Sequence, residues 1–156
     1  MINKFFYIIL CSIIITSCGF KVSKKQKLWD FGIVEINTNG EKRINYSLKN
    51  KLNIYKNQSK EKLIKIHLTT KKTKNVKEKN IKNEITKYHV NITSKIEFDV
   101  VGKTKSGKFT VSRSGEYGVG SQHSQTLNNE KNLMRILIDN ISDQILEEIV
   151  INLNDI

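Results

Sequence analysis

The sequence contains no proline and only two cysteines, and each shortage limits what the chain can be. Both cysteines, Cys11 and Cys18, lie near the start of the chain. The rest of the sequence therefore cannot form a disulfide framework or a cysteine-based zinc site, and its fold must be stabilised by packing alone. The missing proline, together with abundant Lys, Asn and Ile, is typical of a genome rich in A and T. For that reason the net charge of +12 is weak evidence about function when it is taken alone.

The residue patterns of known catalytic and metal sites are also missing. The histidines, His67, His89 and His123, have neither the HExxH spacing nor any other close metal-ligand spacing. His67 and His89 would be neighbours on a polar sheet face if their strands pair, but two histidines without a carboxylate make a poor metal site. No serine lies in a GxSxG motif, and "GEYGVG" (residues 115–120) does not match GxGxxG. We therefore expect a protein that is not an enzyme and has no catalytic residue, metal or cofactor.

One apolar run, Phe5–Ile15, follows the single positive charge of Lys4 near the start of the chain. Its eleven residues suit the hydrophobic region of a bacterial signal peptide and are too few to span a bilayer as a helix. The next residues, "ITSC" (15–18), resemble the lipobox of bacterial lipoproteins, in which an aliphatic and two small residues precede an acylated cysteine. The alternative interpretation is a buried core segment, in which Cys18 is a small hydrophobic residue.

The lipobox resemblance implies a signal peptide at residues 1–17, cleavage after Ser17 and lipidation of Cys18 by acyl chains such as palmitate. A diacylglycerol group plus an N-linked acyl chain exceeds what stable membrane anchoring requires. Residues 18–28 would form the lipidated N-terminus and a basic tether. Gly19 stands where an Asp would resemble an inner-membrane retention signal. The expected location is therefore the outer membrane, on its periplasmic side.

Hydrophobic periodicity predicts a strand and then a helix after the tether. Residues 28–39 are apolar on both faces, which suits a strand that is covered on two sides or paired at a sheet edge. Thr38 and Glu41 have the spacing of a capping box at a helix start. Apolar residues at steps of four, four and three then predict a helix over residues 41–56, with one face on the core: Ile44, Leu48, Leu52 and Tyr55.

The second half of the chain predicts three more strands and a final helix. Alternation of apolar and polar residues predicts half-buried strands at 62–72 and 87–102, joined as a hairpin whose solvated tip lies near Lys77–Lys79. A fourth strand is expected at 108–120, and a helical stripe at 130–153. Residues 29–156 should thus form one α+β domain: a four-stranded, largely antiparallel sheet with two helices packed on one face, in the order β-α-β-β-β-α. The other sheet face should be polar and wet.

In its order of elements and in four local segments, the chain resembles the LptE family of lipopolysaccharide-assembly lipoproteins. The segments are "CGF" (18–20), "WDFGIVEI" (29–36), "RINYSLKNKL" (43–52) and "NISDQILEEIVINL" (140–153). The resemblance implies a partner and plug of the outer-membrane barrel LptD that helps to insert lipopolysaccharide into the outer leaflet. A polar sheet face suits a wet barrel lumen. The alternative is a periplasmic auxiliary lipoprotein of a lipid-transport ABC system, whereas an export signal argues against nucleic acid as a partner.

Five lysines near the expected hairpin tip are the candidate contacts with lipopolysaccharide phosphates or with acidic groups of the barrel lumen. They are Lys71, Lys72, Lys74, Lys77 and Lys79, and only Glu78 opposes them locally. The alternative is that this stretch is a solvated face enriched in lysine by codon usage. In that case, binding would have to be sought on the polar sheet face near His67 and His89.

Overall fold

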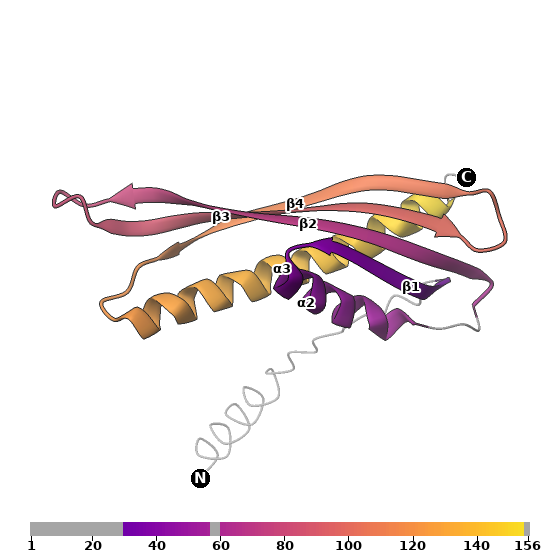
Figure 1. Cartoon of the computed structure of the whole chain (residues 1–156), viewed down its shortest axis with the longest axis horizontal. Coiled ribbons are helices and arrows are strands. Elements are labelled where there is room, and N and C mark those ends of the chain that lie inside the picture. Colours follow the sequence, from indigo (N-terminus) through magenta and orange to yellow (C-terminus); the bar gives the residue numbers. More distant parts are fainter. Residues whose placement is uncertain (1–29, 57–59, 155–156) are drawn as a thin grey trace, which may run out of the picture.

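In the computed structural model, which describes residues 30–56 and 60–154, four strands form one sheet and two long helices cover one of its faces (Figure 1). This confirms the predicted α+β fold class. The signal peptide, Ser17, Cys18 and the tether at 18–28 lie outside the described residues. The elements are β1 (Phe31–Gly40), α2 (Lys42–Leu52), the short 3₁₀ helix η1 (Asn53–Tyr55), β2 (Lys62–Lys79), β3 (Ile85–Val100), β4 (Ser106–Gly118) and α3 (His123–Asn154).

The strands lie in the order β1-β2-β3-β4. The β2–β3 and β3–β4 pairs are antiparallel hairpins, while β1 and β2 are parallel because α2 carries the chain back along one face of the sheet between them. β1 pairs with β2 only as far as Gly40 opposite Thr70. The last part of β2, Lys71–Lys79, therefore has β3 on one side and no neighbouring strand on the other among the described residues.

β1 buries residues from both phases of its alternation because its pairing slips at a bulge between Ile33 and Glu35. Phe31 and Ile33 precede the bulge and Ile36 follows it, and all three are buried. The bulge therefore explains why this strand is apolar in both phases, as its sequence predicts. The bulge turns both apolar sets toward the helices.

The predicted capping box at the start of α2 is wrong. Thr38 lies within β1, and Glu41 occupies the N-cap position without a side-chain hydrogen bond. Thr70 of β2 provides the hydrogen bonds at the start of α2 instead. The Glu41 amide donates to the Thr70 carbonyl at 3.2 Å, and the buried Thr70 hydroxyl donates to Asn45 at 2.5 Å. The turn also requires Gly40, which has φ +92° and whose added Cβ would lie 2.0 Å from the Thr70 carbonyl oxygen.

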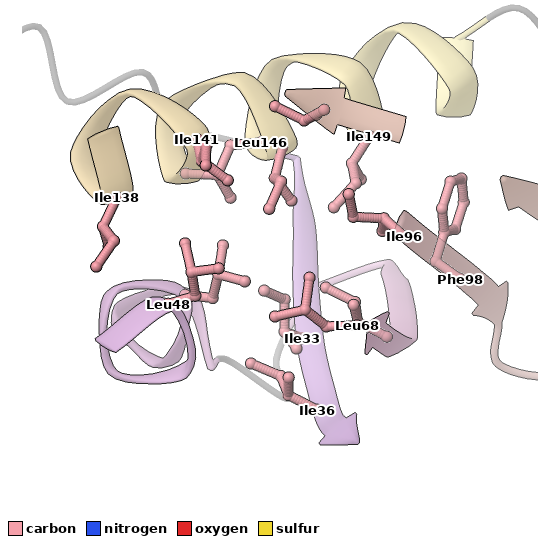
Figure 2. Close-up of a cluster of buried hydrophobic side chains, with 14 of the residues drawn as sticks. Ile33, Ile36, Leu48, Leu68, Ile96, Phe98, Ile138, Ile141, Leu146 and Ile149 are labelled. Atoms are coloured by element: carbon pink, nitrogen blue, oxygen red, sulfur yellow. The ribbon is translucent and has the colours of Figure 1, made fainter. Parts of the chain in front are cut away.

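The core lies between the sheet and both helices. Figure 2 shows Leu48 of α2 and Ile138 and Ile141 of α3 pointing toward the side chains of the strands. The predicted stripes of both helices and the alternation of β2 and β3 are confirmed by burial of these side chains: Ile44, Leu48, Leu52, Ile64, Ile66, Leu68, Val90, Ile92, Ile96, Phe98, Leu137, Ile138, Ile141, Ile145 and Ile149. Tyr55, expected in the core, is partly buried against it.

Two elements are longer than predicted. α3 begins at His123 rather than at residue 130, and β2 continues to Lys79, so that the hairpin tip lies at residues 80–84 instead of near Lys77–Lys79. The longer hairpin extends past β1 at one end of the molecule (Figure 1). Across the described ranges, no helix is long and apolar enough to span a membrane.

Candidate functional site

The candidate lysines lie on a strand and not in a solvated loop. Lys71, Lys72 and Lys74 pair in register with Thr93, Ile92 and Val90 of β3. The partner strand alternates strongly and contains β-branched residues, so it supports pairing along its whole length although β2 is polar here. A loop was expected because the lysine-rich sequence was considered without its partner.

Because side chains alternate along a strand, the five lysines do not form one cluster. Lys72 and Lys74 lie on the helix side of the sheet, opposite the buried Ile92 and Val90. Lys71 and Lys77 lie on the opposite side, which we call the outer face. Lys79 stands at the end of β2 and donates to Asn83 within the hairpin tip at 3.0 Å.

The two helix-side lysines converge on one carboxylate of α3. Lys74 Nζ lies 2.8 Å from Glu130 Oε2 and Lys72 Nζ lies 3.4 Å from Glu130 Oε1. The Tyr117 hydroxyl of β4 donates to the same carboxylate at 2.8 Å. Lys74 also lies 4.3 Å from the centre of the Tyr88 ring, which stacks on Tyr117. We call these five residues the Glu130 cluster.

The electrostatics of the cluster follow from these contacts. The hydrogen bond from Lys74 is the main cause that lowers the pKa of Glu130 to about 2, against the opposing effect of burial. Burial is the largest single effect and lowers the pKa of Lys74, but the hydrogen bonds and charge interactions with Glu130 and Tyr117 together raise that pKa overall. Both groups therefore stay ionised at neutral pH. Lys72 and Lys74 share the single negative charge of Glu130, so the cluster keeps one net positive charge, but both ammonium groups are paired within the chain, which argues against them as free anion contacts.

Sequence reasoning missed Glu130 as a partner of these lysines. Lys72 and Lys74 precede it by 58 and 56 residues, so no local pattern links them. One signal was available: Glu130 lies seven residues before Leu137 and therefore extends the buried stripe of α3 by two turns. A charged residue in line with such a stripe indicates a buried or half-buried ion pair.

The outer face of the sheet is polar at most outward positions of its paired strands, and the exception among the larger side chains is Leu63 of β2, which lies opposite Gly32 of β1 and is half-buried. No helix of the described chain covers this face, and its position above the layer of helices can be followed in Figure 1. The outward residues are Glu35, Asn37, Asn39, Lys65, His67, Thr69, Lys71, Thr73, Asn75, Lys77, Lys87, His89, Asn91, Thr93, Lys95, Glu97, Asp99, Ser106, Lys108, Thr110, Ser112, Ser114 and Glu116. Such a surface can only face water or a wet, hydrogen-bonding partner.

Charges on the outer face are mixed. Lys77 lies 3.3 Å from Glu116 of β4, and Lys108 lies 2.6 Å from Glu97. Thr93 and Ser112 share a hydrogen bond of 2.8 Å across β3 and β4. Within the described part of the chain, Lys71 has no ion-pair partner, so it is the candidate lysine most available to another molecule.

The expectation that His67 and His89 are near neighbours is wrong. His67 pairs with Glu97 of β3, eight positions from His89, a separation of about 27 Å along the strand. His89 instead lies 3.6 Å from Glu116. Residues 30–56 and 60–154 contain no group of three His, Cys, Asp or Glu side chains that could hold a metal ion.

The fold has counterparts among solved structures, although no protein-family model and no curated protein matches the sequence. Rare lipoprotein B from Shewanella oneidensis is similar with a TM-score of 0.60 at 9% identity, over 78% of this chain and 97% of that one. A lipoprotein from Caulobacter crescentus CB15 is similar with a TM-score of 0.54 at 12% identity, over 74% of this chain and 87% of that one. At such low identity the likeness concerns the fold, and the described residues have the fold of rare lipoprotein B.

Proposed function

We propose that the chain is an outer-membrane lipoprotein of the machinery that transports and assembles lipopolysaccharide. In this role it is the partner and plug of an LptD-type barrel. Residues 1–17 are its signal peptide, Cys18 its lipidated residue after cleavage behind Ser17, residues 18–28 its tether and residues 29–156 its folded domain. It has no catalytic role in this proposal. The fold it shares with a rare lipoprotein B supports the proposal.

The outer face is the observation that carries the proposal. A sheet face whose outward side chains are polar from Lys65 to the hairpin tip, and along β3 and β4, is unsuited to contact with lipid tails or to a dry protein interface. The lumen of a large outer-membrane barrel is polar and water-filled, and a protein inside it must present this kind of surface. The long hairpin extends this face past β1, which brings Lys71 and Lys77 toward acidic groups of a barrel wall or phosphates of lipopolysaccharide.

The test is affinity purification of the full chain from detergent-solubilised total membranes, inner and outer, with the retained proteins identified by mass. We expect a large β-barrel protein to be retained. Changing Lys71 and Lys77 to Gln should weaken retention more at low than at high salt, because exposed charges are screened over about 8 Å at physiological salt. Changing Lys72 and Lys74 to Gln is the matched control, since these lysines lie on the helix side of the sheet and not on the outer face.

One outcome would contradict the proposed partner, and another would contradict the proposed lysine contacts. Retention of inner-membrane ABC-transporter subunits in place of a barrel would favour the alternative, a periplasmic auxiliary lipoprotein of a lipid-transport system. Equal barrel retention by both double variants at every salt concentration would show that the outer-face lysines make no contact, and that their number reflects codon usage.

A further inference from the structure

A groove lies between α2 and the first half of α3, on the side of the molecule opposite the outer face. It encloses about 670 Å³. Sites for small molecules typically enclose roughly 300–1,000 Å³, so this groove has the size of a ligand site. Lys72 of β2 borders it, but most of its lining comes from the two helices.

The floor of the groove is apolar. Ile44 of α2 and Ile138 of α3 are buried and line it, and the partly buried Met134 lines it beside them. Leu127 completes the floor with 52% of its surface exposed. An exposed leucine in a concave site, beside a methionine that adapts to irregular shapes, favours a flexible apolar ligand.

The rim of the groove is mainly cationic. Two of its lysines are paired with carboxylates that also line it, Lys51 with Asp139 and Lys72 with Glu130. Three further cations have no side-chain partner in the described ranges: Arg43 of α2 and Lys131 and Arg135 of α3. Lys131 and Arg135 are four residues apart and share one side of the helix. Of the described carboxylates that line the groove, only Glu41 has no described partner, so the rim keeps a positive excess.

We propose that this groove binds one acyl chain of a phosphate-bearing lipid. The chain would lie on the floor formed by Ile44, Leu127, Met134 and Ile138, and the phosphate at Arg43, Lys131 and Arg135. Charge complementarity and an apolar floor of limited volume select this occupant, because neither a free phosphate nor a neutral chain uses both features. The inference goes beyond the plug role, since it concerns a ligand that this chain binds by itself.

The probe is dodecyl phosphate with a photoreactive diazirine at the end of its alkyl chain. The full chain in isolated membranes is labelled below the micelle concentration, and the labelled residues are located by mass. We expect labelling of the α3 segment around Leu127 and Met134 and of the α2 segment around Ile44. Inorganic phosphate should not displace the probe, and the maltoside with the same chain and diazirine should label these segments about tenfold less.

Separate variants test the contributions of the rim and of the floor to labelling. Arg43, Lys131 and Arg135 changed together to Gln should lower labelling by dodecyl phosphate about tenfold, because exposed charge pairs each contribute modestly. The matched control changes three exposed lysines elsewhere, Lys49, Lys95 and Lys103, to Gln and should label normally.

The floor is tested at its exposed leucine. Leu127→Glu should weaken labelling by both probes, whereas Leu127→Met should leave it unchanged, and circular dichroism verifies that each variant is folded. Equal labelling of the rim variant and its control would overturn the proposal. Labelling confined to other segments would also overturn the proposal, as would the finding that a protein partner covers the groove.

Barrel retention is measured on the same material. A retained barrel without groove labelling overturns the lipid site alone, whereas groove labelling without a retained barrel overturns the proposed function alone.

Discussion

Replacing Glu130 with Gln removes the charge at the centre of the Glu130 cluster while keeping the shape of the side chain. The pKa of Glu130 falls from 4.5 to about 2 in the folded chain. A shift of this size corresponds to at most about 3 kcal/mol at neutral pH, since each pKa unit is worth 1.36 kcal/mol. The side chain is 22% exposed and solvent screens it in part, so we expect a loss of about 1–3 kcal/mol in the free energy of unfolding.

The pH dependence provides the sharper measurement. Because the folded pKa lies below the unfolded one, the stabilisation is complete above about pH 4.5 and is lost as the pH falls toward 2. Urea unfolding followed by circular dichroism should therefore separate Glu130→Gln from the unaltered protein at pH 7 and bring the two curves closer at pH 3. Asp143→Asn, an exposed carboxylate of the same helix, is the control and should change little at either pH. Coincident curves for Glu130→Gln at pH 7, or a difference that does not depend on pH, would refute the ion-pair account.

Three other substitutions test the fold and the anchor. Ile141→Asp should cost several kcal/mol of unfolding free energy, because the side chain is fully buried on the helix stripe, whereas Ile141→Val should cost about 1 kcal/mol; an unchanged melting temperature for the Asp variant would contradict this packing. Gly40→Ala should lower the free energy of unfolding by about 2–4 kcal/mol, and by more than Gly102→Ala does. Both glycines have positive φ, but only a Cβ at position 40 would also meet a backbone oxygen. Equal losses of stability in thermal melts would contradict this. Cys18→Ser should abolish incorporation of labelled fatty acid and leave the signal peptide uncleaved, and acylation of this variant would disprove the lipobox assignment.

Much of the fold could be predicted because its signals are local. The stripe from Leu137 to Ile149 and the alternation from Ile64 to Leu68 each depend on residues a few positions apart, and burial confirms both. Periodicity of this kind reports which side of an element faces the core, and that is enough to fix the number and type of the main elements.

Apart from the early start of α3, the errors involve contacts between distant parts of the chain. Thr38 and Glu41 have the right spacing for a capping box, but β1 continues through Thr38 and the distant Thr70 takes over the helix start. The polar stretch after Thr70 has no strand pattern of its own and is held extended by its partner β3. The Glu130 cluster likewise requires β2, β4 and α3 to be placed together, which one-dimensional spacing does not encode.

The edge of β2 that no other described strand pairs with has a consequence for how copies of this protein behave at high concentration. From Lys71 to Lys79, one side of the strand exposes backbone N–H and C=O groups to which a second chain could add a strand. The density of lysine there should make two such edges repel each other, so the same charges that are candidate contacts also oppose self-association through this edge. Variants that replace several of these lysines with Gln should therefore be measured for self-association by size-exclusion chromatography with light scattering. Dimers or larger species in these variants would mean that lost barrel retention reflects edges occupied by other copies and not a missing contact.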